Sequence, residues 1–282
     1  MTQLRWLVTG CSSGLGKAFV RTILARGDKV VATARGDISR LSSLKEAGAE
    51  TVSLDVTAPL SEIKVVAASI LESGPIDVLV NNAGYIEAGM SEEVSYDQYM
   101  AQFETNFFGV IRTTQAILPH FREKKSGFVV FIGSSGGIAG EPGAGPYCAT
   151  KFALKGWYDC FKKETAHLGI KSMLFELGFF RTKIDDPNNY KFRSESIDEY
   201  KEINKLVKQF LQSMDGNQPG DPQKGVEVMI DFVREEGVAK GRVLPERLPL
   251  GSDCLSTLRK RAVEDLNTCN EWEDVIRGTD YK

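Results

Sequence analysis

Short apolar runs alternate along the first 180 residues with longer stretches in which apolar residues recur at helical spacing. The runs predict strands at 4–8, 29–33, 51–54, 78–80, 128–132 and 171–175. The stretches between them predict helices at 16–26, 39–46, 60–73, 96–122 and 147–167. This alternation is typical of βαβ units, which build a parallel sheet with helices on both faces. Because the crossovers are right-handed, we expect a Rossmann-type α/β fold with a doubly wound parallel sheet of about seven strands.

The pattern changes after Phe180. Residues 183–221 are largely polar and charged, and a helix is predicted within them over 197–214. The apolar residues at helical spacing on that helix are Ile203, Leu206, Val207, Phe210 and Leu211. Further on, the sequence predicts a helix at 223–236, a brief strand at 243–244 and an amphipathic helix at 252–276. We expect one domain over 1–282, with a substrate-lid insertion at about 183–221 and a C-terminal helical tail at about 252–282.

Composition excludes several classes of protein. The formal net charge is -3, from 35 basic and 38 acidic residues, so no clustered basic face for nucleic acid is expected. There is no leader pattern at the N-terminus and no apolar run of about 18 residues, which predicts a cytoplasmic protein without a transmembrane segment. The five cysteines form no CxxC pair and the two histidines lie apart from them, so we expect no metal site and no disulfide framework.

A glycine-rich turn, Thr9-Gly10-Cys11-Ser12-Ser13-Gly14-Leu15-Gly16, follows the first predicted strand and opens the first predicted helix. In that context, Gly10 allows a tight turn, Gly14 lets the backbone approach a pyrophosphate and Gly16 lets helix and strand pack closely. Ser12 and Ser13 add hydroxyl donors. Three glycines are also compatible with an ordinary tight turn, but their position between strand and helix favours a dinucleotide site.

The residues at the end of the second predicted strand indicate whether NAD or NADP is preferred. An acidic residue there would bind the ribose 2′-hydroxyl of NAD, but this chain has Ala34 followed by Arg35. A guanidinium can hold a 2′-phosphate with two hydrogen bonds. Asp37 is close by but lies past the end of the strand. The alternative to a phosphate contact is that Arg35 is an ordinary solvated loop residue. We therefore expect NADP(H) as cofactor.

Tyr147 and Lys151 lie four residues apart on a predicted helix, so they share one face. A tyrosine has an ordinary pKa near 10, and a neighbouring ammonium stabilises its phenolate. Such a pair can exchange a proton with a carbonyl or alcohol oxygen without a histidine. The two histidines, His120 and His167, lie near predicted helix ends and suit caps or surface positions. Taken alone, a Tyr–Lys pair at this spacing is also common on helix surfaces.

Several motifs in order resemble the classical short-chain dehydrogenase/reductase family. They are the glycine-rich turn at 9–16, Asp55, Asn81-Asn82-Ala83-Gly84, Asn106, Ser134, Tyr147 and Lys151. The resemblance is close over roughly 4–182 and extends to the rest by general layout. Its nearest branch is similar to 17β-hydroxysteroid and retinol dehydrogenases and to fungal reductases of secondary metabolism.

The resemblance implies catalytic roles for four residues. Tyr147 would be the general acid/base, and Lys151 would lower its pKa and bind the nicotinamide ribose. Ser134 would hydrogen-bond the substrate oxygen, in preference to its neighbour Ser135. Asn106 would hold a water molecule that links Lys151 to solvent.

The resemblance also implies cofactor contacts along the chain. The glycine-rich turn includes Gly10, Ser12, Ser13, Gly14, Leu15 and Gly16; the other expected contacts are Arg35, Asp55, Val56, Asn82, Ala83, Gly84, Tyr147, Lys151, Leu177, Gly178, Phe179 and Thr182. One departure is that Leu177-Gly178 stands where the family usually has Pro-Gly. The chain loses the fixed φ of proline there, which makes the loop less rigid.

The function that follows is NADPH-dependent reduction of a ketone or aldehyde on a hydrophobic small molecule. Four aromatic residues, Phe179, Phe180, Tyr190 and Phe192, suggest either a large apolar substrate or an anchor for the lid. The alternatives are an NADP-dependent alcohol dehydrogenase running in the oxidative direction, an NADP(H)-bound cyclase and a non-catalytic binding protein. The helices at 96–122 and 147–167 resemble the family's dimer-forming pair, which implies a homodimer or homotetramer.

Overall fold

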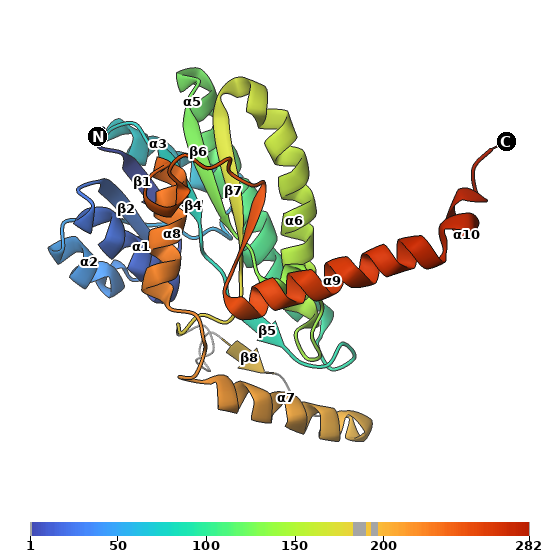
Figure 1. Cartoon of the computed structure of the whole chain (residues 1–282). Helices are drawn as coiled ribbons and strands as arrows, with labels where there is room; N and C mark the ends of the chain where they lie inside the picture. Colours follow the sequence, from blue (N-terminus) through green and yellow to red (C-terminus); the bar gives the residue numbers. More distant parts are fainter. Residues whose placement is uncertain (1, 183–189, 193–196, 282) are drawn as a thin grey trace.

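A parallel sheet organises the chain, whose computed structural model describes residues 2–182, 190–192 and 197–281. Within these residues, seven strands form one sheet in the order β3-β2-β1-β4-β6-β7-β9, confirming the expected fold (Figure 1). Their bounds are β1 Arg5–Val8, β2 Lys29–Ala34, β3 Glu50–Ser53, β4 Val78–Asn81, β6 Gly127–Ile132, β7 Ile170–Leu177 and β9 Arg247–Leu250. Every pairing in the sheet is parallel.

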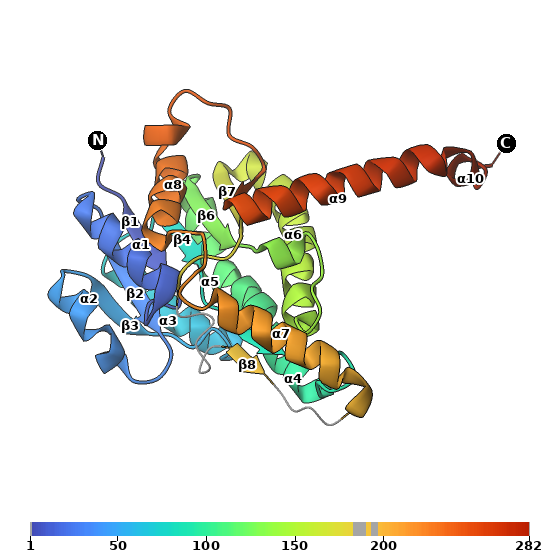
Figure 2. The same cartoon turned by 60° about the horizontal axis from the view of Figure 1, so that its bottom comes forward.

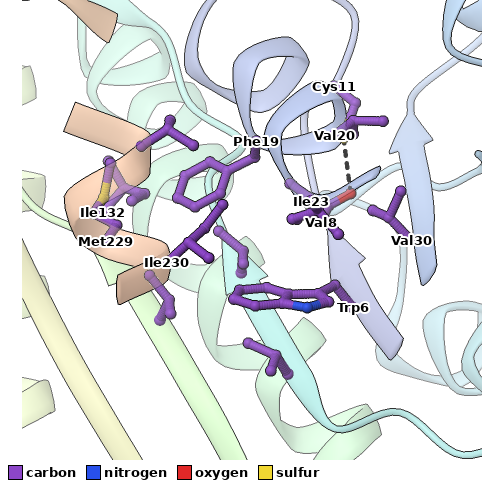
Figure 3. Packing of buried hydrophobic residues seen from close by; sticks show 14 of the residues in the cluster. Trp6, Val8, Cys11, Phe19, Val20, Ile23, Val30, Ile132, Met229 and Ile230 are labelled. Atoms are coloured by element: carbon purple, nitrogen blue, oxygen red, sulfur yellow. Dashed lines mark hydrogen bonds between the residues drawn. The ribbon is translucent and has the colours of Figure 1, made fainter. Parts of the chain in front are cut away.

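Two hydrophobic cores lie on opposite faces of the sheet because successive strand side chains point in opposite directions. Trp6 and Val8 of β1 pack on one face with the helices α1 (Gly14–Ala25) and α8 (Pro222–Arg234), as Figure 3 shows. Leu7, between them, packs on the other face. The helices of that face are α3 (Leu60–Glu72), α5 (Gly109–Lys124) and α6 (Gly145–Thr165).

The strand order reverses beside β1. After β1 the chain runs to β2 and β3 on one side, and then returns to β4, β6 and β7 on the other. At this reversal, the N–H of Thr9 donates to the carbonyl of Val80 at 3.1 Å, and the hydroxyl of Thr9 accepts the N–H groups of Asn82 and Ala83 at 3.0 Å, which keeps the loops after β1 and β4 in contact. In open α/β sheets, ligands bind at such a switch point, outside the carboxyl ends of the strands.

Three details of the sequence prediction change. The last strand is β9, Arg247–Leu250, and not 243–244; Val243 lies exposed in a loop, while Leu250 pairs with Leu177 of β7. The helix predicted over 96–122 divides into α4 (Tyr96–Phe103), a π-helical turn at Glu104–Phe108 and α5. A small parallel ribbon of β5 (Ile86–Ala88) and β8 (Tyr190–Phe192) had no counterpart in the prediction.

The remaining helices are short or lie away from the sheet. Between β2 and β3, a 3-10 turn at Ile38–Leu41 leads into α2 (Ser42–Glu46). The predicted lid helix is present as α7 (Lys201–Met214), below the carboxyl ends of the strands in Figure 1, while 183–189 and 193–196 of the predicted lid lie outside the described residues. The tail forms α9 (Ser252–Glu271) and α10 (Glu273–Arg277). Across the described ranges, no helix combines the length and apolar character needed to cross a membrane.

Candidate active site

The glycine-rich turn presents the open N-terminus of α1 to a cavity. Gly10 has φ +73°, and a Cβ there would lie 2.8 Å from the Cα of Ala83; at Gly16 a Cβ would overlap the carbonyl of Gly10. The side chain of the N-cap residue, Ser13, makes no capping hydrogen bond, and the first turn carries no acidic residue. Backbone N–H groups without intrahelical partners therefore point toward an anion of the size and charge of a pyrophosphate.

The cavity beside this turn has a volume of ≈ 310 Å³. Most of the residues expected to contact the adenosine and pyrophosphate line it: Gly10, Ser12, Ser13, Gly14, Leu15, Arg35, Asp55, Val56, Asn82, Ala83 and Gly84. Thr182, which the resemblance places at the nicotinamide carboxamide, also lines it. Gly16 does not line the cavity, because it packs beneath the turn against Gly10 and Asn82.

A second arginine, which sequence reasoning missed, joins Arg35 at the wall of this cavity. The 3-10 turn after β2 brings Arg40 back over the glycine-rich turn, where its Nη2 donates to Ser12 Oγ at 3.0 Å. Asp37 is held elsewhere: it accepts the N–H and hydroxyl of Ser39, and these hydrogen bonds lower its pKa. In the sequence, the sign of this second arginine is that Arg35 and Arg40 flank Asp37. That both arginines reach the same cavity depends on the 3-10 turn, which the sequence pattern does not predict.

Tyr147 and Lys151 share a face of α6 as their spacing predicts. The Nζ of Lys151 lies 5.6 Å from the centre of the Tyr147 ring and donates to the carbonyl of Ile132 at 2.8 Å. The Lys151 side chain is buried, and burial lowers its pKa from 10.5 to about 8. This ammonium therefore loses its proton far more readily than that of a surface lysine, and it lies beside the phenol ring that it is expected to influence.

Ser134 lies next to Tyr147 across a glycine. Its Oγ accepts the N–H of Gly136 at 3.1 Å. A Cβ on Gly136 would lie 3.3 Å from Cε1 of Tyr147 and 3.5 Å from Oγ of Ser134, so the glycine leaves room between the two side chains. Ser134 and Ser135 both line a second cavity, and Ser134 is the one whose hydroxyl accepts a backbone N–H.

Asn106 is buried in the π-helical turn between α4 and α5. Its Oδ1 accepts the N–H of Tyr85 at 3.1 Å, and its Nδ2 donates to the carbonyl of Tyr85 at 2.9 Å. The side chain thus clamps the loop after β4. Such π turns recur at functional sites because they displace backbone carbonyls from the helical pattern; the water relay implied by the resemblance stays a prediction.

A second cavity, of ≈ 690 Å³, continues from the first and contains this cluster. It is lined by Asn106, Ser134, Tyr147, Lys151, Leu177, Gly178, Phe179 and Thr182, and on the side of α7 by Ile203, Leu206, Val207, Phe210 and Leu211. The rings of Phe179 and Phe210 meet edge-on at 5.8 Å, which ties α7 to the loop after β7. Phe180 reaches the cavity but is mostly buried against Gly220 and Gly225, and the side chains of Tyr190 and Phe192 lie outside the described residues.

Asp253, at the start of α9, is a further residue of this cavity that the sequence did not reveal. Its Oδ2 accepts the N–H of Phe179 at 2.6 Å, and the N–H of Gly178 donates to the carbonyl of Leu250 at 2.9 Å. The tail therefore holds the loop in which the family's proline is replaced by Leu177. The local sequence assigns Asp253 no role in the site, because its partner lies 74 residues away in the chain.

Histidine and thiol chemistry have no place in this cluster. Neither His120 nor His167 lines either cavity; His120 instead contacts the backbone of Ile76 through Nε2. Cys148 lines the second cavity, and burial raises the pKa of its thiol, which favours the protonated form. Among the described residues, no group of three or more metal-binding side chains gathers.

Known proteins are similar to this chain in sequence and in fold. A family model described as short chain dehydrogenase matches residues 5–191. The chain is 31% identical to oxidoreductase BOA17 of Botryotinia fuckeliana over 98% of both chains. It is similar to the structure of a short-chain dehydrogenase from Streptomyces avermitilis (38% identity, 99% of each chain, TM-score 0.87) and to that of a single-residue variant of actinorhodin polyketide ketoreductase with NADPH (27% identity, 88% of this chain and 95% of that chain, TM-score 0.72). With the matched segment covering six of the seven strands of the sheet, the glycine-rich turn and the Ser134–Tyr147–Lys151 cluster, the chain belongs to the short-chain dehydrogenase family of oxidoreductases.

Proposed function

We propose that this protein is an NADPH-dependent reductase of a ketone or aldehyde carried by a hydrophobic small molecule. The observation that supports this most directly is the position of Ser134, Tyr147 and Lys151 in one cavity with an apolar wall. Three polar groups converge there, while α7 supplies aliphatic and aromatic side chains. A cavity of this kind suits an apolar substrate with one reactive oxygen.

Two features of the first cavity support NADP(H) as the cofactor. The open N-terminus of α1 suits the pyrophosphate, and Arg35 and Arg40 together suit a 2′-phosphate because guanidinium groups bind phosphate in paired hydrogen bonds. Asp37, the one acidic residue near the strand end, is already bonded to Ser39. The related ketoreductase with NADPH is consistent with this preference.

Each residue of the cluster has its own role in the proposed reaction. When bound, NADPH supplies the hydride to the carbonyl carbon. The Tyr147 hydroxyl donates a proton to the carbonyl oxygen, and the Lys151 ammonium stabilises the phenolate that remains. Ser134 donates a hydrogen bond that orients the same oxygen, while Asn106 holds the Tyr85 loop and carries the proposed water relay. The aromatic pair Phe179–Phe210 excludes water from the apolar side.

The remaining sequence predictions stay part of this proposal. The reverse reaction, oxidation of an alcohol with NADP⁺, uses the same groups, so direction follows from the substrates and their concentrations. We likewise propose a cytoplasmic location, a role in secondary metabolism and a lid at 183–221. We also propose a homodimer or homotetramer built on the 96–122 and 147–167 helices. A purely binding protein would have no need of the intact Ser134–Tyr147–Lys151 cluster, whereas an NADP(H)-bound cyclase remains an alternative that a lid would permit.

The experiment is an assay of NADPH consumption against a panel of hydrophobic ketones and aldehydes, with Tyr147→Phe and Tyr158→Phe compared. Tyr158 lies on the same helix, but its hydroxyl donates to the carbonyl of Glu246 at 2.7 Å and lies away from the cavity. We expect Tyr147→Phe to bind NADPH normally and to lose about 10²–10⁴-fold in kcat, as for other general acids. Tyr158→Phe should keep its kcat. Equal kcat in wild type and Tyr147→Phe would overturn the proposal.

A further inference from the structure

The second cavity has a polar side as well as the apolar side that α7 forms. The segment between β6 and α6 contributes Ser135 and Glu141 to its lining, and the first two turns of α9 contribute Asp253 and Thr257. These segments are neighbours, because α9 lies beside the 3-10 turn Ser135–Gly137. In Figures 1 and 2, α7 lies below the start of α9, so the two helices reach the cavity from different sides. We call Ser135, Glu141, Asp253 and Thr257 the polar wall.

The side chains of the polar wall are largely unbonded within the chain. Those of Ser135, Glu141 and Thr257 form no hydrogen bond or ion pair with any residue in the described ranges. Asp253 uses Oδ2 to accept the N–H of Phe179, while Oδ1 is buried without a partner among the same residues. A carboxylate only accepts hydrogen bonds, and buried acceptors are normally paired. A ligand that fits this wall therefore supplies donors.

The polar wall also carries negative charge that no described cation balances. Its two carboxylates, Glu141 and Asp253, form no ion pair in the parts of the chain that the structure describes. Lys151 is the one cation among the described residues that line this cavity, and its Nζ donates to the carbonyl of Ile132. The apolar side of the cavity offers no competing charge. A charged group on the substrate is therefore attracted or repelled mainly by the two carboxylates.

We propose that the substrate carries a hydrogen-bond donor, an ammonium or a hydroxyl group, that faces the polar wall while its apolar part lies against α7. This inference rests on the proposed function, since it concerns the ketone or aldehyde whose oxygen lies at Ser134 and Tyr147. A carboxylate or phosphate on the substrate would meet Glu141 and Asp253 as a like charge. The polar wall thus selects cationic and hydroxylated carbonyl compounds and rejects anionic ones.

Glu141 is the residue of the polar wall whose charge can be changed without disturbing the loops around it. Its side chain is exposed and bonds to nothing in the described ranges. Asp253, in contrast, also holds Phe179, so its replacement would alter the loop together with the charge. The matched control is Glu164 on α6, which is likewise exposed but lines neither cavity.

The first test compares the binding of four ketones of similar shape. They are acetophenones with a para aminomethyl, hydroxymethyl, ethyl or carboxylate group, and the matching acetylnaphthalenes extend the reach of each group. Binding is measured by calorimetry to the Tyr147→Phe variant with NADPH, in which the proposed reaction is blocked and the nicotinamide is uncharged.

We expect the aminomethyl or hydroxymethyl ketone to bind about 2–5-fold more tightly than the ethyl ketone, and the carboxylate ketone to bind about 2–5-fold more weakly, as for pairs with an exposed carboxylate. A preference for aminomethyl identifies a cationic substrate, and a preference for hydroxymethyl alone identifies a neutral donor. No gain over the ethyl ketone from either donor group, or a carboxylate ketone that binds as well as the ethyl ketone, would overturn the proposal.

The second test reverses the charge of the polar wall. In the same Tyr147→Phe background, Glu141→Lys should make the carboxylate ketone bind more tightly than the aminomethyl ketone, whereas Glu164→Lys, with the same net charge, should keep the original order. Equal binding of the ethyl ketone to both variants shows that the cavity is intact. An unchanged order in Glu141→Lys rules out selection by the polar wall.

A separate measurement keeps the proposed function distinguishable from this inference. Consumption of NADPH by the enzyme with Tyr147 intact, and its loss in Tyr147→Phe, report on the reductase reaction and do not depend on the order of binding. A preserved reaction with no preference among the four ketones overturns the role of the polar wall alone. A binding order as expected, without NADPH consumption, overturns the reductase assignment and leaves the chemistry of the wall supported.

Discussion

The carboxylate of Asp253 accepts the backbone N–H of Phe179 at 2.6 Å. Its other oxygen, Oδ1, is buried and has no hydrogen-bond partner in the described parts of the chain. Two glycines make room for it: a Cβ on Gly178 would overlap Oδ1, and Gly251 has φ +101° with its Cβ position 2.6 Å away. The start of α9 thus holds the loop that contacts the nicotinamide in the proposed complex, and a donor on the bound cofactor or substrate would satisfy the remaining oxygen.

Replacing this carboxylate should weaken cofactor binding. A hydrogen bond to a charged acceptor contributes about 1.5–3 kcal/mol, so Asp253→Ala should raise the Kd of NADPH about 10–100-fold. Asp253→Asn retains an oxygen acceptor for Phe179 and should recover most of the affinity. The measurement is titration of NADPH fluorescence.

A matched control for Asp253 is Asp221→Ala. Asp221 also accepts backbone N–H groups at the start of a helix, those of Gln223 and Lys224, but it does not line either cavity. The Asp221→Ala substitution should lower the free energy of unfolding by about 1 kcal/mol and leave the Kd of NADPH unchanged. Equal losses of NADPH affinity in the Asp253→Ala and Asp221→Ala variants would mean that the effect is general destabilisation.

The contiguous motifs predicted from sequence lie beside the two cavities at the carboxyl ends of the strands. A turn such as Thr9–Gly16 or a pair such as Tyr147 and Lys151 carries its geometry within a few residues, because strand and helix periodicity place the side chains. The fold followed from the same regular alternation. Predictions that depended on local spacing therefore agree with the structure to within a few residues of each boundary.

Features set by distant contacts could not be predicted in this way. The last strand was misplaced at 243–244 because an edge strand is chosen by its register with β7, where Arg247 pairs with Leu174. Arg40 reaches the cofactor cavity only because the 3-10 turn brings it there. Asp253 reaches the loop after β7 only because the start of α9 packs against that loop. The amphipathic tail was predicted, but its pattern does not say which molecule covers the apolar face.

The two arginines at the first cavity should determine preference for NADPH. Arg35→Ala and Arg40→Ala each remove a cationic donor from the proposed 2′-phosphate site, so each should raise the KM for NADPH about 10–100-fold. NADH lacks that phosphate, and its KM should change little. Lys45→Ala is the control, because Lys45 is an exposed base on α2 that does not line the cavity. Parallel increases for NADH and NADPH would show that the arginines support the loop and do not select the phosphate.

Burial of Lys151 should make stability depend on pH. Its pKa is lowered from 10.5 to about 8, so between these values the unfolded chain holds a proton that the folded protein has released. Stability rises with pH wherever the unfolded state binds more protons. From pH 7.5 to 9.5, the free energy of unfolding of the cofactor-free wild type should therefore increase by about 2 kcal/mol relative to Lys151→Met. Urea unfolding of both proteins measures this, since other titrations cancel in the difference; a constant difference would contradict a buried, destabilised ammonium.

Two glycine-to-alanine substitutions should have opposite effects on stability. Gly16 packs so closely that a Cβ would overlap the carbonyl of Gly10 and lie 2.7 Å from Nδ2 of Asn82. Neither neighbour can move without opening the turn, so Gly16→Ala should lower the unfolding free energy by about 1–3 kcal/mol and abolish measurable NADPH binding. Gly156 lies in α6 with nothing within 4 Å of its Cβ position.

At Gly156, alanine has the higher helix propensity and meets no obstacle. Gly156→Ala should therefore raise the unfolding free energy by about 0.5–1 kcal/mol and leave the Kd of NADPH unchanged. Thermal unfolding and NADPH titration of the two variants side by side separate close packing at the turn from backbone entropy in the helix. If Gly16→Ala bound NADPH as the wild type does, the close packing of the glycine-rich turn would not be needed for binding. The assignment of the anion site to the start of α1 would then fail.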